Sequence, residues 1–328
     1  MRVYRPESGR LVRREERTPE PRRGEVLVRV RATSLNYRDL LILDGGLGAG
    51  SGSLIPVSDA AGEVAAVGEG VTRFEPGDRV INAFHSDWIA GRLPDGLAGY
   101  GNAQDGWLAE YRAVGEHALV ALPDSLTYEQ GATLPCAAVT AWTSLSGVRP
   151  GDVVLTLGTG GVSLFALQLA KQHGARVVAT TSSAAKAAKL TGLGADAVID
   201  YTATPEWGKA VLDATGGRGA DRIVEVGGPG TFAQSLVAAG THHADIALVG
   251  FVGRSGPPVE FMDLFRSGAT IRKIWVGSRE DTEDLLRHLA VRPIAPVIDG
   301  VFPFDHAGAA FERFRSRHNL GKVVIAVP

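Results

Sequence analysis

The sequence has very little cysteine: Cys136 is the single one among 328 residues. One cysteine excludes an internal disulfide and any zinc site built from several thiolates. Long apolar runs are also missing, since no stretch approaches the roughly 20 apolar residues of a membrane-spanning helix. The charged first segment, MRVYRPESGRLVRREERTPEPRRGE, lacks the apolar core of a secretory signal. We therefore expect a cytoplasmic protein with no membrane partner.

Charge of one sign is not in excess. The chain has 34 Lys and Arg residues against 36 Asp and Glu residues, a formal net charge of -2. A protein that holds a phosphate backbone needs a basic surface, so we expect no nucleic-acid partner. The composition, with 45% hydrophobic residues, is that of a globular protein. At this length, two hydrophobic cores and therefore two domains are expected.

The sequence pattern differs between the first third of the chain and the rest. The first third contains short Val-rich runs, and EVLVRVRATSLN, from Glu25, alternates apolar and polar residues as a half-buried strand does. From about residue 125, strand-like runs alternate with helical stretches; these runs are Val153–Leu157, Arg176–Thr180, Ala197–Ile199, Asp221–Val226, Ile246–Val249 and Ile271–Val276. This order predicts an α/β fold, with a doubly wound parallel sheet beside a β-rich domain. The last segment offers a helix around Ala307–Arg317 and a closing strand, KVVIAV, that could rejoin the first domain.

A glycine-rich turn joins the first run of the parallel sheet to a helical stretch. Gly158, Gly160 and Gly161 follow the run, and Val162 continues into the helix. Such a turn lets backbone N–H groups meet a pyrophosphate at the positive end of the helix dipole. The fingerprint G-x-G-x-x-G is matched as G-x-G-x-x-S, with Ser163 in the third position. We interpret the turn as a dinucleotide site; a plain strand-to-helix turn is the alternative.

The end of the second parallel run indicates which dinucleotide binds. NAD-preferring sites usually carry Asp or Glu there, whereas this chain has Thr180, Thr181, Ser182 and Ser183. No carboxylate is present to repel a 2′-phosphate, and Ser hydroxyls with the Lys186 ammonium would bind one. The sequence therefore predicts NADP, as NADPH. The alternative is that both Ser residues cap the next helix and that Lys186 is solvated.

Several motifs together resemble the medium-chain dehydrogenase/reductase superfamily, in its quinone-oxidoreductase-like and zinc-type alcohol dehydrogenase-like branch. The motifs are SLNYRDLLI, IPVSDAAGEVAAVGEGVTRFEPGDRV, GWLAEY, ATLPCAAVTAW, GTGGVSLFALQLAK, GADAVIDY, VEVGG and GKVVI. The resemblance implies a GroES-like catalytic domain (1–124 and 294–328) and a Rossmann NADP-binding domain (125–293). It also implies a small-molecule substrate and a homodimer formed by edge pairing of the last Rossmann strand, TIRKIWV.

The resemblance also shows what this chain lacks. Zinc-dependent members carry a ligand Cys where Asn36 stands and a ligand His where Ser58 stands, and Asp59 takes the place of a Glu. Cys136 alone matches a ligand position. One thiolate and one carboxylate make a poor zinc site, because a catalytic zinc normally has three protein ligands. We expect no metal.

Further coenzyme contacts are implied by the resemblance and by the rule that ligands lie beyond the carboxyl ends of parallel strands. They are Thr140, Tyr201, Gly227, Phe251, Val252, Gly277, Ser278, Asn319 and Lys322. Strand-end packing is the alternative for each of them.

The resulting functional prediction is a metal-independent, NADPH-dependent oxidoreductase that transfers hydride to a quinone or to an activated enone or aldehyde. Asn36 and Tyr37, with Ser58 behind them, are the candidate catalytic donors for the oxygen that gains charge. Tyr37 could instead fill the core of the β-rich domain. Three other functions stay open: a zinc-type alcohol dehydrogenase, an enoyl-thioester reductase, and a non-catalytic NADPH-binding protein.

Overall fold

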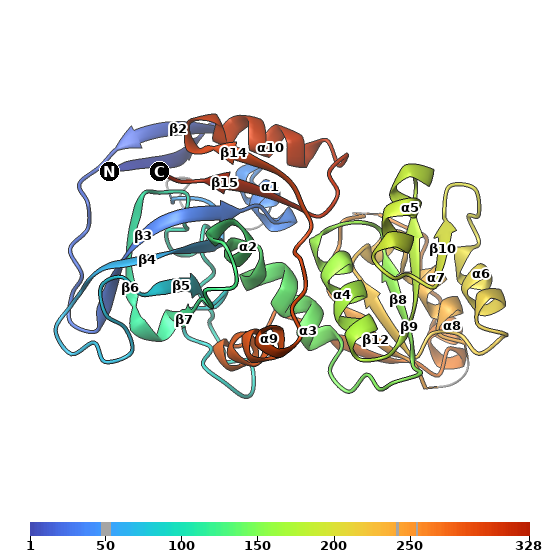
Figure 1. Ribbon diagram of the computed structural model, residues 1–328. Coiled ribbons are helices and arrows are strands. Elements are labelled where there is room, and N and C mark those ends of the chain that lie inside the picture. The colour runs from blue at the N-terminus through green and yellow to red at the C-terminus, as the bar shows by residue number, and fades with distance from the viewer. Residues whose placement is uncertain (47–53, 241–242, 254) are drawn as a thin grey trace. The chain divides into compact units, whose positions relative to one another are not determined.

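The computed structural model describes residues 1–46, 54–240, 243–253 and 255–328, and Figure 1 labels their helices and strands. The chain forms two compact units. Unit 1 is Met1–Val139 with Gly277–Pro328, and unit 2 is Thr140–Val276. Residues 125–139 and 277–293, which we expected in the Rossmann domain, therefore lie in unit 1. The reason is packing: helices α2 (Tyr128–Ala132) and α9 (Arg279–Val291) contact strands of unit 1.

Unit 1 is built on a sheet of seven strands in the order β14-β15-β3-β4-β5-β7, with β6 paired to β3. A separate hairpin of β1 and β2 accompanies it. The strands are β1 (Arg2–Glu7), β2 (Arg10–Glu15), β3 (Glu25–Ser34), β4 (Asp59–Val67), β5 (Arg79–Asn82), β6 (Tyr111–Gly115), β7 (Leu119–Ala121), β14 (Ile298–Pro303) and β15 (Lys322–Ala326). The helices are α1 (Tyr37–Leu43), α2, α9, α10 (Ala307–Arg315) and a π-helical turn (Leu134–Ala138).

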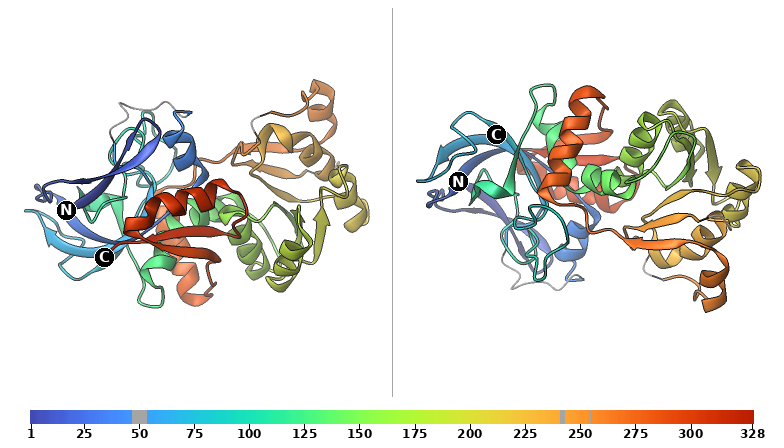
Figure 2. Two further views of the ribbon diagram at one scale, coloured as in Figure 1. Left: turned by 90° about the horizontal axis from the view of Figure 1, so that it is seen from above. Right: turned by 90° about the horizontal axis from the view of Figure 1, so that it is seen from below.

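Strand β3 shows why the sheet forms. Val26, Val28 and Val30 alternate along it, each at most 1% exposed in the core of unit 1, which is the period of a strand with one face buried. Strand β15 pairs antiparallel with β3, so that Val324 faces Ser34. The last strand of the chain therefore returns to the sheet begun by the first third (Figures 1 and 2).

Unit 2 contains a parallel sheet of six strands in the order β10-β9-β8-β11-β12-β13. The strands are β8 (Val153–Leu157), β9 (Arg176–Thr181), β10 (Ala197–Asp200), β11 (Arg222–Glu225), β12 (Asp245–Leu248) and β13 (Thr270–Lys273). Five helices follow this order, namely α4 (Gly161–Gln172), α5 (Ala184–Gly192), α6 (Trp207–Ala214), α7 (Phe232–Ala238) and α8 (Phe261–Arg266), and α3 (Val139–Ser144) leads into the unit. All six predicted strands are present, and the α/β fold class is confirmed.

The last predicted strand differs most from its observed bounds. It was expected over 271–276, whereas β13 ends at Lys273. Val276 has a φ of 63°, in the left-handed region that a strand does not contain, so the chain leaves the extended conformation before Gly277. No helix within the described residues is long and apolar enough to cross a membrane.

Candidate functional site

The turn between β8 and α4 has the geometry of a phosphate-binding elbow. Gly158 has a φ of 73°, a conformation that L side chains rarely adopt, and its N–H donates to the carbonyl of Thr180 at 3.0 Å. Gly160 precedes the first turn of α4, and a Cβ placed on it would have no atom within 4 Å. Gly161 and Val162 begin the helix. Open space therefore lies in front of backbone N–H groups at the positive end of a helix.

Ser163 explains how the chain departs from the glycine fingerprint without disturbing the turn. Its hydroxyl donates to the carbonyl oxygen of Leu157, the last residue of β8, at 2.6 Å, and the side chain is buried. The third glycine of the fingerprint allows close packing of helix and strand. Here a hydrogen bond joins the same two elements.

The residues expected around a 2′-phosphate lie together at the end of β9. Ser182 and Ser183 follow the strand, and Lys186 lies in the first turn of α5. The N–H of Tyr201 donates to the carbonyl of Thr181 at 3.0 Å, which brings Tyr201 beside them. Ser183 stands at the N-cap of α5, and its side chain makes no capping hydrogen bond. A contact of its hydroxyl with a 2′-phosphate stays a prediction. A nearby carboxylate, Asp200, accepts bonds from the N–H and hydroxyl of its neighbour Thr202.

The loops after β11 and β12 bring Gly227, Phe251 and Val252 together. The N–H of Gly253 donates to the carbonyl of Gly227 at 2.8 Å, and that of Val252 to the carbonyl of Val226 at 3.3 Å. A pocket of about 530 Å³ opens there, and Phe251 is among its lining residues. It lies beyond the carboxyl ends of parallel strands, where open α/β sheets bind ligands.

Sequence reasoning missed Glu225, which holds the loop after β11. Its carboxylate is fully buried and accepts from the N–H groups of Gly227 and Gly228 at 2.7 and 2.9 Å and from the hydroxyl of Thr231 at 2.6 Å. An acid directly before two glycines, in VEVGG, was the available signal.

Four other predicted coenzyme contacts lie in local structure. The Thr140 side chain is buried and its carbonyl accepts from the Ser144 hydroxyl at 2.7 Å. The Ser278 hydroxyl forms a capping box with Asp281 at the start of α9, and buried Gly277 precedes it. Asn319 donates to the carbonyl of Gly321 at 2.9 Å. Their contact with a coenzyme stays a prediction.

In unit 1, the two candidate donors Asn36 and Ser58 lie in one buried network with Asp59 and Lys322. The Lys322 ammonium donates to Asn36 Oδ1 at 2.5 Å and to the carbonyl of Leu35 at 2.7 Å. Asn36 Nδ2 donates to Ser58 Oγ at 3.3 Å, and Ser58 Oγ donates to Asp59 Oδ1 at 2.8 Å. The four side chains are at most 8% exposed. The sequence placed Lys322 with the coenzyme contacts, whereas its ammonium bonds a candidate catalytic residue.

Backbone strain marks the position before Ser58. Val57 has a φ of 75° and is 1% exposed. A β-branched residue in the left-handed region costs on the order of 1 to 3 kcal/mol and persists only where the surroundings impose it. Trp107 N–H donates to the Val57 carbonyl at 2.9 Å, and Asn82 donates to the carbonyl of Ser58 at 2.9 Å.

Burial controls the ionisation of the acids in this network. Burial raises the pKa of Asp39 to about 6, and this carboxylate accepts from the Asn36 N–H at 2.8 Å. Burial also raises the pKa of Asp59, while the nearby Lys322 charge opposes that shift. The pKa of the Cys136 thiol is raised by burial and by Asp59.

The Tyr37 side chain has contacts that suit a structural role. Its ring packs against the core of unit 1, and its hydroxyl accepts from Arg317 at 3.4 Å. Core packing, the alternative considered for this ring, is therefore present, and a donor role stays a prediction.

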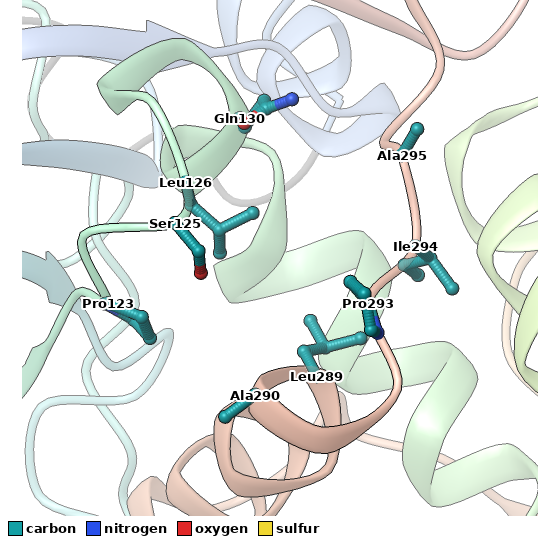
Figure 3. A pocket seen from close by; sticks show the side chains of 9 residues that line it. All are labelled: Pro123, Ser125, Leu126, Gln130, Leu289, Ala290, Pro293, Ile294 and Ala295. Carbon is teal, nitrogen blue, oxygen red and sulfur yellow. The ribbon is translucent and has the colours of Figure 1, made fainter.

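A second pocket, of about 260 Å³, lies in unit 1 between the segment from Pro123 to Gln130 and the segment from Leu289 to Ala295 (Figure 3). Most of its lining side chains are apolar. Gln130 belongs to the capping box of α2 with Thr127. None of the predicted site residues lines this pocket.

The residues of unit 2 fit a nicotinamide dinucleotide. The open space at Gly160 would receive the pyrophosphate, and the hydroxyls after β9 would receive the adenosine ribose. The residues of unit 1 do not fit a catalytic zinc. Asn36 and Ser58 offer neither thiolate nor imidazole, and no group of three or more His, Cys, Asp or Glu side chains is placed to hold a metal in the described residues.

Comparison with known families identifies both halves of the chain. Residues 22–124 match the alcohol dehydrogenase GroES-like domain, and residues 161–291 match the family described as zinc-binding dehydrogenase.

Curated relatives match along nearly the whole length. A zinc-type alcohol dehydrogenase-like protein of Schizosaccharomyces pombe is 41% identical over 93% of this chain and 91% of its own. An acryloyl-coenzyme A reductase of Metallosphaera sedula is 31% identical over 95% of both chains. A chloroplastic quinone-oxidoreductase homolog of Spinacia oleracea is 30% identical over 95% of this chain and 92% of its own.

Solved structures with the same fold match nearly the whole chain. A crystal structure of an alcohol dehydrogenase from Sinorhizobium meliloti has a TM-score of 0.93 and 38% identity, and covers 99% of this chain and 98% of its own. An NAD-dependent alcohol dehydrogenase has a TM-score of 0.91 and 31% identity, with full coverage of both chains. A mycobacterial protein complexed with NADPH has a TM-score of 0.83 and 26% identity, covering 99% of this chain and 100% of its own.

Proposed function

The chain belongs to the medium-chain dehydrogenase/reductase superfamily and is an NAD(P)-dependent oxidoreductase, and on that premise we propose that it uses NADPH to reduce conjugated carbonyl compounds without a metal ion. The observation that carries the proposal is the buried network of Asn36, Ser58, Asp59 and Lys322. It offers hydrogen-bond donors and an ammonium where a zinc site needs thiolates and imidazoles.

The choice of a conjugated acceptor follows from what a hydrogen-bond donor can stabilise. When bound, the coenzyme supplies the hydride. The β-carbon of an enone receives it, the electron pair of the carbon–carbon double bond shifts, and the carbonyl oxygen becomes an enolate oxygen. A proton from water then completes the product at the α-carbon. One oxyanion donor is worth about 3 to 4 kcal/mol, which suits a charge that is already delocalised.

Asn36 is the residue that we assign to this oxygen. Its amide has two N–H groups, which make a bond of 3.3 Å to Ser58 Oγ and a hydrogen bond to the Asp59 carboxylate. The long bond to Ser58 is the one that a substrate oxygen would replace. Ser58 does not donate to the substrate, because its own hydrogen is donated to Asp59, and its oxygen accepts from Asn36. Quinones fit the same site, since a hydroquinone anion also carries its charge on oxygen.

NADPH is favoured over NADH by the end of β9. Ser182 and Ser183 follow the strand and provide hydroxyls there, with no carboxylate among the residues from Thr180 to Ser183. Among the similar structures, one is NAD-dependent and one contains NADPH, so the support for NADPH comes from these side chains.

A conjugated thioester is a second candidate substrate, favoured by the similarity to a protein named acryloyl-coenzyme A reductase. The chemistry is the same addition to a β-carbon, with the thioester oxygen as the charged atom.

A second copy of the chain is the proposed partner, because β13 is the last strand of its sheet and Ile271 on it is 42% exposed.

The experiment that tests the proposed function is an acceptor panel. Loss of NADPH absorbance is followed with 2-cyclohexen-1-one, 1,4-benzoquinone, crotonyl-coenzyme A and, as the saturated control, cyclohexanone. The proposal expects turnover with at least one conjugated acceptor and a far lower kcat/KM with cyclohexanone. Turnover of cyclohexanone alone contradicts it.

A further inference from the structure

Lys322 is a buried cation placed beside a candidate catalytic residue. The side chain, on β15, is 2% exposed, and its ammonium donates to Asn36 Oδ1 and to the carbonyl of Leu35. Asp59 Oδ2 lies 3.9 Å from it. A buried ammonium is destabilising unless it is paired and hydrogen-bonded. We therefore ask what the Lys322 ammonium does for Asn36, to which it is bonded.

The chemistry of the ammonium gives the network a direction. An ammonium donates and accepts nothing, so the oxygen of the Asn36 amide faces Lys322. The NH₂ group of Asn36 therefore faces Ser58 Oγ, and the Ser58 hydrogen is donated to Asp59. The bonds run from Lys322 to Asn36, from Asn36 to Ser58 and from Ser58 to Asp59, and the Asn36 NH₂ group also hydrogen-bonds Asp59.

One bond in this series is long. The 3.3 Å separation of Asn36 Nδ2 from Ser58 Oγ lies beyond the range of about 2.7 to 3.2 Å of good N–H···O bonds. The bonds on either side of it are 2.5 and 2.8 Å. The Asn36 NH₂ group also hydrogen-bonds the Asp59 carboxylate, so the bond to Ser58 Oγ is the weak one of the amide, and a carbonyl oxygen with growing negative charge is a better acceptor than Ser58.

From this geometry we infer that Lys322 is a positioning residue, which orients and polarises the Asn36 amide as the donor to the substrate's carbonyl oxygen. The inference rests on the proposed function, because it names what holds the donor of that reaction. A hydrogen bond from a charged group is stronger than a neutral one, and hydrogen bonds in series polarise each other. The Lys322 ammonium, which donates to the amide oxygen of Asn36, therefore makes the amide N–H a better donor.

This role differs measurably from the coenzyme contact that the family resemblance implies for Lys322. Lys322→Met keeps an unbranched side chain one atom shorter and removes the charge. We expect its kcat for 2-cyclohexen-1-one to fall about 10- to 100-fold, less than the loss of a whole oxyanion donor. The dissociation constant for NADPH, measured by fluorescence titration, is expected to stay unchanged. Lys322→Arg, which retains a charged donor, is expected to keep more of the wild-type kcat than Lys322→Met.

A double-mutant cycle with Asn36→Ala gives the decisive comparison. If Lys322 acts through Asn36, Lys322→Met has little further effect on kcat once the amide is absent. The inference is overturned if Lys322→Met lowers kcat by the same factor in both backgrounds, or if its main effect is weaker NADPH binding.

Folding is controlled separately. Thermal unfolding is recorded for every variant, and Lys322→Met/Asp59→Asn, which removes the ammonium together with the carboxylate 3.9 Å from it, replaces Lys322→Met if that variant does not fold. The cycle is then measured with the double variant, and the same two outcomes apply. A wild-type protein that turns over no acceptor of the panel overturns both the proposed function and the inference. An active wild type with additive effects overturns the inference alone.

Discussion

Lys322 Nζ lies 2.5 Å from Asn36 Oδ1, although the two residues are 286 positions apart in the chain. Pairing of β15 with β3 makes this contact possible, because Lys322 begins β15 and Asn36 follows the end of β3. The family resemblance implies that zinc-dependent members carry a ligand cysteine at the position of Asn36. The same fold therefore holds a fixed positive charge beside the donor that we assign to the substrate.

Substitutions at two glycines of the elbow are expected to have different effects: one lowers coenzyme affinity and the other lowers stability. Gly160 has a φ of -76° and open space at its Cβ position, so Gly160→Ala should change the free energy of unfolding by less than about 1 kcal/mol. The added methyl group occupies the space of the pyrophosphate, and NADPH affinity should fall at least about tenfold, or 1.4 kcal/mol. Gly158→Ala should instead lower stability by about 1 to 2 kcal/mol, because its φ is 73°.

The control for this pair is Gly308→Ala, in α10 of unit 1, where a Cβ also meets no atom within 4 Å. It should leave NADPH affinity unchanged. Equal NADPH affinity in Gly160→Ala and the wild type would contradict the elbow as the pyrophosphate site.

A carboxylate at Ser183 should reverse the coenzyme preference. Ser183→Asp places a negative charge where the 2′-phosphate is expected, so the dissociation constant for NADPH should rise at least about tenfold while that for NADH falls. Ser183→Asn, neutral and of the same shape, should have a much smaller effect. The ratio of the two dissociation constants, measured by titration, decides; a ratio unaffected by Ser183→Asp would be inconsistent with NADPH preference at this site.

Most strands of unit 2 could be predicted from the sequence because they contain apolar runs between turn residues, whereas β13 reads TIRK and its bounds were missed. β8 was predicted to the residue, and the order of strands and helices was sufficient to identify the doubly wound sheet. The elbow and the hydroxyls after β9 could also be found, since their function depends on residue type at fixed spacing.

The buried network of unit 1 could not be predicted in the same way. Asn36, Ser58 and Lys322 come from three distant segments, and sequence spacing does not indicate which way a lysine side chain points. GKVVI suggested a coenzyme contact for Lys322, yet the residue stands at the start of a buried strand with its ammonium on Asn36. The strain at Val57 likewise follows from tertiary contacts and has no sequence signal.

Asp39 should make stability depend on pH. Its pKa in the folded chain is about 6, above the ordinary value of 3.8, so the folded state binds this proton more tightly than the unfolded state. The stability contributed at low pH is lost as the pH rises from about 4 to about 6. Relative to Asp39→Asn, the free energy of unfolding of the wild type should fall by up to about 3 kcal/mol over that interval. Parallel urea-unfolding profiles of the two proteins would contradict the raised pKa.

The exposed edge of β13 should form the contact between two copies. Symmetric pairing of two β13 strands brings residues near their own copies, so Ile271→Glu should place like charges together and yield monomers. Ile271→Gln, of equal size and neutral, should remain dimeric. Light scattering at micromolar concentration measures the mass; a monomeric wild type would rule out the proposed partner.

The central claim, that conjugated carbonyls are reduced here without a metal ion, is tested most directly by kcat for NADPH-dependent reduction after dialysis against a strong zinc chelator, with zinc measured in the same sample. The account predicts an unchanged kcat and zinc far below one atom per chain. A kcat that is lost with the chelator and restored by one equivalent of zinc would contradict it.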